Sequence, residues 1–453
     1  MHDDPIAARR TIAGGQVVHG IHQVLAAVEA GLAHLPREGS PARGVAEVKA
    51  VFKKPVLVEE TVIFHLTRFS DGKCKIAGRM QGENVCEVTI GWGEMPTAPQ
   101  IELPPLAREA VADLGFDQLA GKAGSLELGL DKRLAEEMFP LAMCALGGAW
   151  IAEVLSLSRL VGMHCPGLHS IFGQCAVNFR ERSGGKLLEY QVDRTDERFG
   201  TVLIEVKGPR VQGELTVYYR PPPERQPGMT EVRAVVEPGC FKRSVALIVG
   251  GSRGLGEVTA RLIAAGGGLA IITYHQGAAD AEGVAAEIRG AGGRCEVLQL
   301  DVRQSDSLMA RLTAGSLSPR SVYYFATPRI FGRRRSFFGH DLLREFEEVY
   351  VTAFGRLIDR VAASCGARLR VFYPSSVAVT EPPREIAEYA MAKRTGEEMC
   401  AFYNRHGKQI EIVVERLPRT RTDQTSTILP AAAEDGLKVM LPHVMRMEGP
   451  CQE

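Results

Sequence analysis

Short apolar runs alternate with longer amphipathic stretches throughout the second half of the chain. Runs of about 4 to 8 apolar residues are typical of buried strands, whereas apolar positions that recur every three or four residues are typical of helices. Amphipathic segments such as 258–265 and 384–403 lie between the runs. The alternation predicts right-handed βαβ units, and therefore a doubly wound parallel α/β sheet with helices on both faces. The predicted strands are SVALIVGG, GLAIITY, CEVLQLDV, SVYYFAT, RLRVFYPSS and IEIVVERLP.

The first half has a different order, in which a long apolar helical segment precedes a group of strands. The segment VVHGIHQVLAAVEAGLAHL is followed by VAEVKAVF, TVIFHLTRF, KCKIAGRMQ and NVCEVTIGW, with hairpin signals at SDGK and QGEN. A second helix, predicted for FPLAMCALGGAWIAEVLSLSRLV, is followed by LHSIFGQCAVNFRE, KLLEYQVDR, GTVLIEVKG and VQGELTVYYR. The order of elements therefore repeats, although the repeats share little residue identity. One helix wrapped by an antiparallel sheet, twice over, resembles a double hotdog fold of the α+β class; two unrelated α+β modules are the alternative.

A proline-rich stretch, RPPPERQPGMTEVRAVVEPGCFK, separates the two halves. It can continue neither a helix nor a central strand, so it predicts a linker. The length of 453 residues also favours several domains. The predicted organisation is a first hotdog module over 1–100, a second over 101–222, a linker over 223–243 and the doubly wound domain over 244–453.

The bulk composition is that of a globular protein without a dominant charge. The chain is 45% hydrophobic and 24% charged, and its formal net charge is zero. No overall field attracts nucleic acid or an anionic membrane, so neither is expected as a partner. The 10 cysteines are scattered without a CxxC pair, so neither a metal site nor a disulfide framework is expected. The chain lacks an apolar leader and any run of about 18 apolar residues, which predicts a cytoplasmic protein.

A glycine-rich turn follows the first predicted strand of the second half. In GGSRGLGE, Gly250, Gly254 and Gly256 have the spacing GxxxGxG at the entrance to a helix. Glycines permit a tight turn and let the backbone approach a pyrophosphate, whose charge a helix N-terminus stabilises. At the first strand-to-helix turn of a βαβ domain, this motif indicates dinucleotide binding.

A tyrosine and a lysine lie one helical turn apart in EYAMAK. Tyr389 and Lys393 are expected to project side by side, and a neighbouring ammonium group would lower the pKa of the phenol from about 10. A pair at this spacing also arises by chance on solvated helix faces. Ser376, at the end of the strand RVFYPSS, is expected at the carboxyl edge of the sheet, where open α/β sheets bind ligands.

The glycine turn, the serine and the tyrosine–lysine pair together resemble the short-chain dehydrogenase/reductase family. The resemblance implies that Tyr389 protonates a carbonyl oxygen, that Lys393 lowers the pKa of this tyrosine and contacts the nicotinamide ribose, and that Ser376 donates a hydrogen bond to the substrate oxygen. The cofactor-binding residues that it implies are Gly250, Ser252, Arg253, Gly254, Leu255, Gly256, Tyr274, Asp301, Val302, Ala326, Tyr389 and Lys393.

Charges near the predicted cofactor site favour NADPH. The strand LAIITY ends at Tyr274 without the acidic residue that would hold a free ribose 2′-hydroxyl. Arg253 lies inside the glycine turn, where a cation could pair with a 2′-phosphate. Asp301 resembles the family residue that contacts the adenine, and an Asx-type turn at a strand end is the alternative.

The second half also departs from the family pattern. Residues 324–327, Tyr-Phe-Ala-Thr, replace the usual Asn-Asn-Ala-Gly after the fourth strand, and Tyr350 replaces the asparagine of the family's proton relay. Pro418 and Arg419 replace a Pro-Gly pair. These changes suggest a divergent branch, nearer to the reductase domains of polyketide synthases, or a chain with an impaired relay.

The opening segment HDDPIAARRTIAGGQVVHGIH resembles the active region of hotdog hydratases that act on 2-enoyl thioesters. In that alignment His2 takes the position of the catalytic histidine and His19 that of a His-Gly pair. The family's aspartate, five residues before the histidine, would fall before Met1. The carboxylate therefore precedes the given sequence, comes from elsewhere or has been lost with the activity. His169, in CPGLHS, is a further candidate in the second module.

One substrate class would connect the two halves. By resemblance, both families act on acyl chains carried as thioesters on coenzyme A or an acyl carrier protein. The predicted function is NADPH-dependent reduction of a 3-oxoacyl thioester, followed by dehydration to the 2-enoyl form in the hotdog half, in fatty acid or polyketide biosynthesis. A hydratase–dehydrogenase of acyl breakdown and a non-catalytic acyl-binding or scaffold protein are the alternatives. A homo-oligomer is expected by analogy, and the arginines at 329 and 333–335 could dock an acidic carrier or be merely solvated.

Overall fold

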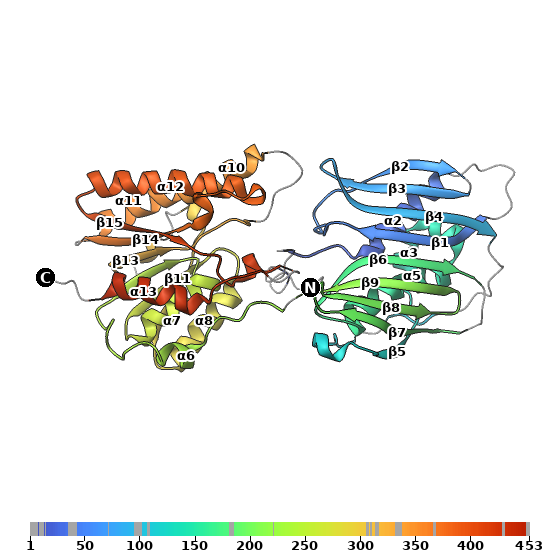
Figure 1. The fold of residues 1–453 in the computed structure, drawn as a ribbon, viewed down its shortest axis with the longest axis horizontal. Coiled ribbons are helices and arrows are strands. Elements are labelled where there is room, and N and C mark those ends of the chain that lie inside the picture. The colour runs from blue at the N-terminus through green and yellow to red at the C-terminus, as the bar shows by residue number, and fades with distance from the viewer. Residues whose placement is uncertain are drawn as a thin grey trace. The chain divides into compact units, whose positions relative to one another are not determined.

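The computed structural model divides the chain into two compact units, which are described separately. The first unit comprises Met1–Pro222 with Thr427–Pro430, and the second comprises Pro223–Ser426 with Ala431–Glu453. Figure 1 shows the elements of each unit as a ribbon. The structure describes residues 8, 13, 15–34, 43–70, 72–94, 102–106, 109–180, 185–220, 222–304, 308, 310–312, 317–330, 338–365, 368–427 and 431–449.

The first unit is built on a 9-stranded sheet in which every neighbouring pair is antiparallel. Eight of the strands lie where alternating sequence patterns predict them, and β5 is an additional strand at one edge. The strands are Arg43–Phe52 (β1), Ile63–Ser70 (β2), Lys73–Met80 (β3), Glu83–Glu94 (β4), Ala123–Glu127 (β5), Ser170–Phe179 (β6), Leu187–Asp196 (β7), Thr201–Lys207 (β8) and Val211–Tyr219 (β9).

The strand order of this sheet is symmetric about a central pair. The order is β2-β3-β4-β1-β6-β9-β8-β7-β5, so β2, β3, β4 and β1 on one side correspond to β7, β8, β9 and β6 on the other. The two halves join through β1 and β6, where Val48 pairs with Val177 and Ala50 pairs with Cys175. The sheet therefore contains the repeated order of elements that the sequence predicts.

Helices of the first unit share one core with this sheet. Their bounds are Gly20–Ala33 (α2), Lys132–Met138 (α3), Pro140–Leu146 (α4) and Gly148–Arg159 (α5), with short turns at Phe116–Gln118 (η1) and Leu160–His164 (η2). The prediction of one continuous helix over 139–161 is wrong. The chain bends by 118° between α4 and the segment formed by α5 and η2. Gly147 lies at this bend with a φ of +80°, in the left-handed region that favours glycine.

A buried carboxylate ties α5 to the turn between β8 and β9. Glu153 is 1% exposed, and its side chain accepts hydrogen bonds from the backbone N–H groups of Arg210 (3.0 Å) and Val211 (2.6 Å). The Nε of Arg210 donates to the same carboxylate at 3.0 Å. A buried charge is tolerated when it is paired and hydrogen-bonded, so these three donors fix the position of the turn against the helix.

Glu153→Gln is expected to lower the free energy of unfolding of the first unit by about 1–2 kcal/mol, because the amide keeps the shape but loses the charge and one acceptor. Urea unfolding followed by tryptophan fluorescence would measure this, since Trp150 lies in the same core. Glu214→Gln, on an exposed position of β9, is the matched control and should leave the free energy of unfolding unchanged. Equal stability of the two variants would contradict this role for Glu153.

The second unit contains a 6-stranded sheet in the order β12-β11-β10-β13-β14-β15. Every neighbouring pair is parallel, and the order reverses direction beside β10, which confirms the predicted doubly wound sheet. The strands are Val245–Val249 (β10), Leu269–Tyr274 (β11), Arg294–Gln299 (β12), Ser321–Tyr324 (β13), Leu369–Ser376 (β14) and Ile410–Leu417 (β15).

Helices cover both faces of this sheet, and each face has its own buried core. In Figure 1 the helices α10, α11 and α12 lie along one face, and α6, α7, α8 and α13 lie along the other. The bounds are Met229–Arg233 (α6), Gly254–Ala265 (α7), Ala278–Gly290 (α8), His340–Glu347 (α10), Phe354–Ser364 (α11), Ala387–His406 (α12) and Gly436–Glu448 (α13). A π-helical turn, Glu348–Ala353 (η4), joins α10 to α11, and short turns occupy Val302–Gln304 (η3), Val377–Val379 (η5), Arg384–Ile386 (η6) and Asp423–Thr425 (η7).

Residues 223–243, for which the prolines predict a linker, fold as part of the second unit. They include the short helix α6, and Met229, Val232 and Phe241 are buried in the core with α7. The difference arises because Pro223 and Pro227 precede α6 and Pro238 follows it, so the apolar residues between them can pack at helical spacing against the sheet domain.

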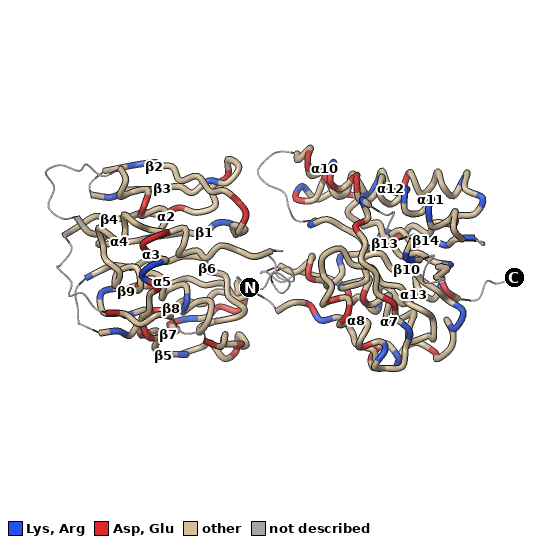
Figure 2. Tube along the Cα trace, turned by 180° about the vertical axis from the view of Figure 1, so that it is seen from behind, with Lys and Arg blue, Asp and Glu red and all other residues tan. Residues whose placement is uncertain are grey.

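Acidic and basic residues are interspersed along both units (Figure 2), consistent with the zero net charge of the sequence. Among the described residues, no single helix has the length and apolar character needed to cross a membrane; only the bent combination of α4 with α5 and η2 meets that test by length and composition.

Candidate functional site

The predicted catalytic and cofactor residues of the second unit gather at the carboxyl edge of its parallel sheet. The glycine turn follows β10, Tyr274 ends β11, Asp301 follows β12, Ala326 follows β13 and Ser376 ends β14. Because parallel strands all present their carboxyl ends at one edge, these residues lie along the same edge of the sheet. The structure thus brings together residues that are far apart in the sequence.

The glycine turn leads directly into α7. Gly250 has a φ of +83° and Gly254 a φ of +60°, so both adopt backbone conformations that favour glycine. A Cβ on Gly256 would lie 2.2 Å from the carbonyl oxygen of Gly250, so only glycine permits this close packing of turn and helix. The arrangement fits a dinucleotide, since α7 begins at Gly254 and a helix N-terminus with a glycine turn can receive a pyrophosphate.

The hydroxyl groups of Ser376 and Tyr389 lie close together, and the serine hydroxyl lowers the pKa of the tyrosine. Ser376 is the last residue of β14, and Tyr389 lies in the first turn of α12 with only 9% of its surface exposed. The Oγ of Ser376 also accepts a bond from the backbone N–H of Ala378 at 3.2 Å, which fixes the serine at the end of its strand. A carbonyl group placed beside this pair would meet two hydroxyl donors.

Lys393 is buried inside a cage of aromatic rings. Its Nζ lies 4.0 Å from the ring centroid of Tyr350, 4.8 Å from that of Tyr373 and 5.9 Å from that of Tyr389. The same atom donates a hydrogen bond of 2.7 Å to the carbonyl oxygen of Pro374. The ring faces and the carbonyl favour the charged ammonium group, but burial is the larger effect and lowers the pKa of Lys393 to about 7.

The predicted effect of Lys393 on Tyr389 is wrong for this structure. Burial raises the pKa of Tyr389 to about 12, and the hydrogen bond from Ser376 opposes this only in part. The physical reason is that Lys393 donates to Pro374 and is itself buried, so its pKa falls instead of stabilising a phenolate. At neutral pH, Tyr389 therefore retains its proton.

Two further tyrosines hold the π-helical turn that the sequence did not predict. The hydroxyl of Tyr324, on β13, donates to the carbonyl oxygen of Val349 at 2.7 Å, and that of Tyr373, on β14, donates to the carbonyl oxygen of Tyr350 at 3.2 Å. A side-chain hydroxyl that bonds to a backbone carbonyl of a helix can replace a regular helical hydrogen bond, and so stabilises a local departure from α-helical geometry. The strands therefore hold the turn that carries Tyr350 beside Lys393.

Two residues that depart from the family pattern, Thr327 and Tyr350, contact each other in the structure. The hydroxyls of Thr327 and Tyr350 lie 2.5 Å apart, so the residue that replaces a glycine bonds to the residue that replaces the relay asparagine. Sequence reasoning noted both changes but missed that Tyr350 and Tyr373 contact Lys393 and that Tyr324 holds the π-helical turn. The available signal was the density of tyrosines in the strands SVYYFAT and RVFYPSS.

The stability of the second unit should rise with pH above neutrality. The pKa of Lys393 falls from its ordinary value of 10.5 to about 7 on folding, so between these values the unfolded chain binds more protons than the folded one. Stability then increases with pH across this window, by at most about 1.4 kcal/mol per pH unit. Urea unfolding at pH 7, 8 and 9 would measure the slope.

Lys393→Met should abolish this slope, and Lys408→Met, at an exposed position, should preserve it. Above pH 10 the trend should reverse, because the raised pKa of Tyr389 makes the folded chain hold a proton that the unfolded chain releases. A parent protein with flat stability from pH 7 to 9 would contradict the burial of a titrating lysine.

The remaining predicted residues occupy the expected edge with ordinary local contacts. Asp301 accepts a hydrogen bond of 3.0 Å from the backbone N–H of Arg303, which is the Asx-type turn given as the alternative. Its carboxylate also lies 3.7 Å from the Nε2 of His275. Arg253 is the residue before α7, and Tyr274 packs partly buried beside the core of that face.

The hydratase-like residues of the first unit are only partly described. His2 lies outside the described residues. His19 precedes α2, and its Nδ1 lies 3.2 Å from the Oγ of Ser158 on α5. The Nε2 of His169 lies 2.8 Å from the Oδ1 of Asp113.

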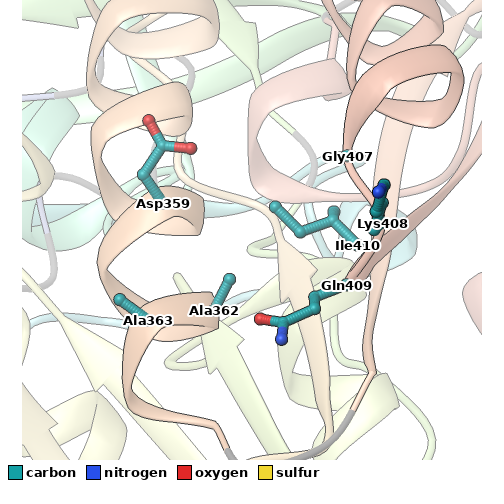
Figure 3. Close-up of a pocket in the computed structure, with 7 residues that line it drawn as sticks. All are labelled: Asp359, Ala362, Ala363, Gly407, Lys408, Gln409 and Ile410. Carbon is teal, nitrogen blue, oxygen red and sulfur yellow. The ribbon is translucent and has the colours of Figure 1, made fainter.

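A pocket of the second unit, drawn in Figure 3, lies away from this edge. It is lined by Asp359, Ala362, Ala363, Gly407, Lys408, Gln409 and Ile410. These residues belong to the later part of α11 and the segment that enters β15, which places the pocket at the amino end of the sheet. It is therefore not part of the candidate site.

Sequence comparison identifies a family pattern in the first part of this unit. Residues 244–315 match the short chain dehydrogenase family. This segment contains β10, β11 and β12 with the glycine turn, and it ends before Ser376 and Tyr389.

Curated relatives match the same region. The uncharacterised oxidoreductase YgfF of Escherichia coli is 39% identical over 71 residues, which are 16% of this chain and 29% of that protein. A 3-oxoacyl-acyl-carrier-protein reductase of Synechocystis is 39% identical over 64 residues, 14% of this chain and 26% of that protein. A 1-cyclohexenylcarbonyl-CoA reductase of Streptomyces collinus is 36% identical over 69 residues, 15% of this chain and 25% of that protein. The matched region thus spans about a quarter to a third of these relatives.

Solved structures with similar folds cover about half of the chain. The angucycline C-6 ketoreductase LanV with bound NADP has a TM-score of 0.42 and 18% identity, and the alignment covers 47% of this chain and 91% of LanV. FolM alternative dihydrofolate reductase 1 of Brucella suis, in complex with NADP, has a TM-score of 0.37 and 16% identity, covering 40% of this chain and 76% of FolM.

Proposed function

We propose that the second unit is an NADPH-dependent reductase that reduces a 3-oxoacyl thioester to the 3-hydroxyacyl form. The observation that carries this proposal is the proximity of the Ser376 and Tyr389 hydroxyl groups, which lie beside buried Lys393 at the edge of the sheet that also holds the glycine turn. Reduction of a carbonyl group needs a proton for the oxygen and a donor that positions it, and this pair contains both.

The roles of the chain's own residues follow from their environment. Tyr389 keeps its proton at neutral pH and can donate it to a carbonyl oxygen, while Ser376 holds that oxygen by a hydrogen bond. Because the pKa of Lys393 is near neutrality, its ammonium group can lose a proton and so restore the proton that Tyr389 donates. Bound NADPH would supply the hydride. Water is limited around the proton donor because Tyr389 packs edge-on against Phe346 and Tyr350.

The residues of the second unit fit NADPH in particular. The turn with Gly250, Gly254 and Gly256 would receive the pyrophosphate at the start of α7. Arg253 lies in that turn and could meet a 2′-phosphate, whereas β11 ends in Tyr274 without a carboxylate that would repel it.

The substrate class is proposed from the curated relatives. One is named a reductase of 3-oxoacyl groups on an acyl carrier protein, and another a reductase of a coenzyme A ester. An acyl thioester on either carrier would therefore be a suitable substrate for the same edge of the sheet.

For the first unit we propose a double hotdog that dehydrates the 3-hydroxyacyl product to the 2-enoyl form. The support is the duplicated strand order around β1 and β6 with one buried helix segment before each group of strands. The product of one unit would then be the substrate of the other, as expected in fatty acid or polyketide assembly.

Stopped-flow measurement of NADPH absorbance with acetoacetyl coenzyme A would test the reductase. We expect NADPH consumption that depends on the thioester, and a smaller or absent signal with NADH. Absence of NADPH consumption by pure, folded protein would refute the reductase. Formation of a 2-enoyl thioester from 3-hydroxybutyryl coenzyme A, measured by ultraviolet absorbance, would separately test the first unit.

A non-catalytic acyl-binding or scaffold function is the second candidate, and one observation favours it. Tyr350 replaces the relay asparagine, and its ring lies against the Nζ of Lys393. In a scaffold the cofactor would serve stability only, so NADPH would raise the melting temperature without being consumed.

A further inference from the structure

A buried histidine and a buried arginine lie side by side at one corner of the first unit's sheet. His169 immediately precedes β6 and Arg220 immediately follows β9, and these strands pair with Ser170 opposite Tyr219. The backbone N–H of Arg220 donates to the carbonyl oxygen of His169 at 2.8 Å, which continues the ladder by one pair. The two residues are therefore direct cross-strand neighbours.

Arg220 carries a buried charge without a carboxylate partner among the described residues. It is 3% exposed, its Nη2 donates to the carbonyl oxygen of Leu168 at 2.6 Å, and its buried Nε has no hydrogen-bond partner in the described part of the chain. Burial lowers the pKa of the Arg220 guanidinium group. Three other arginines have an unpartnered buried nitrogen among the described residues: Arg210 and Arg370 each form an ion pair with a glutamate, and Arg419 donates from its Nη2 to the carbonyl oxygen of Thr425.

His169 presents a second buried nitrogen without a partner. The residue is 7% exposed, and its ring packs against that of Tyr219 with centroids 5.6 Å apart. Its Nε2 lies 2.8 Å from the carboxylate of Asp113, while its Nδ1 is buried with no hydrogen-bond partner among the described residues. The contact with Asp113 fixes the orientation of the ring, so Nδ1 is held in place for another group.

We propose that Arg220 and His169 together bind an oxyanion, the phosphate ester or carboxylate of a small ligand. A buried guanidinium group without a counter-ion is unfavourable, and an oxyanion supplies the missing charge and accepts from the free Nε. The imidazole of His169, whose Nε2 faces Asp113, would present its unpartnered Nδ1 to the same ligand. Neither residue belongs to the reductase site, so this proposal is independent of the proposed reduction.

Calorimetric titration with inorganic phosphate, and the melting temperature at matched ionic strength, would test the site in the full chain. We expect one phosphate per chain and a rise in melting temperature of about 3 °C at roughly ten times the dissociation constant. Arg220→Met should abolish both effects, and in chloride buffer it should be at least as stable as the parent because an uncompensated charge has been removed. Arg198→Met, at an exposed arginine paired with Asp196, is the matched control and should bind phosphate like the parent.

His169→Gln provides a second test if Arg220→Met does not fold, and it should weaken phosphate binding about tenfold through loss of one charge-assisted hydrogen bond. Acetate in place of phosphate distinguishes the two ligand sources: tighter binding of phosphate indicates a phosphate ester, and tighter binding of acetate indicates a carboxylate. Failure of the parent to bind either anion would overturn the site. Equal binding by the parent, Arg220→Met and His169→Gln would also overturn it, because the anion would then bind elsewhere.

Discussion

Tyr389→Phe should reduce NADPH-dependent turnover of a 3-oxoacyl thioester by about 100- to 10,000-fold, the range associated with loss of a general acid. The substitution removes the hydroxyl that pairs with Ser376 and leaves the ring in its packed position against Phe346 and Tyr350. Binding of NADPH should change little, because the phenol hydroxyl is not needed to form the glycine turn. Single-turnover absorbance with saturating NADPH would measure the chemical step, and quenching of protein fluorescence would measure binding.

Tyr403→Phe is the matched control for this experiment, since Tyr403 also lies on α12. Its hydroxyl donates to Asp359 at 2.8 Å, away from the carboxyl edge of the sheet. We expect turnover close to that of the parent. Equal turnover by the parent and both tyrosine variants would contradict Tyr389 as the proton donor, whereas loss of turnover only in Tyr389→Phe would support that role.

Gly396→Ala should destabilise the second unit by about 3 kcal/mol, because a methyl group has no room beside Tyr373. A Cβ at this position of α12 would lie 1.9 Å from the hydroxyl oxygen of Tyr373 and 3.3 Å from the carbonyl oxygen of Tyr350. Those two atoms form the hydrogen bond that holds the π-helical turn. The added methyl therefore displaces the tyrosine and leaves a buried carbonyl unsatisfied. Urea unfolding would measure the loss.

Two companion variants make this test specific. Gly283→Ala, within α8, places a methyl group where no atom lies within 4 Å and should stabilise the helix by about 0.5–1 kcal/mol. Tyr373→Phe removes the oxygen that the methyl would meet, so the double variant with Gly396→Ala should lose less stability than the sum of the single variants. Additive losses would contradict a direct clash between these residues.

The sheet of the second unit was predictable from sequence because each strand is a short apolar run between amphipathic helices. In a parallel sheet covered on both faces such runs are buried throughout, so pattern alone identifies them. The first unit was less predictable at Gly147, because the uncharged apolar run 139–152 around it fits a single helix as well as two helices joined by a bend. Only the backbone conformation of that glycine distinguishes the two.

The position of the candidate catalytic residues was predictable, but their electrostatics were not. The spacing of Tyr389 and Lys393 places both on α12, yet the pKa of each depends on burial that local spacing does not reveal. The ring of Tyr350 contacts Lys393 from the π-helical turn, and Tyr373 does so from β14. These contacts join η4, β14 and α12, so no short stretch of the sequence reveals that the rings surround Lys393.

The pairing of β1 with β6 has a consequence for biogenesis. During translation β1 and its neighbours leave the ribosome long before Ser170–Phe179, so the outer backbone of β1 has no partner strand for that interval. Unpaired strand edges recruit other chains, and pairings between distant segments form slowly. Yield on overexpression should consequently depend on growth temperature and chaperone supply, and truncation before β6 should produce aggregates.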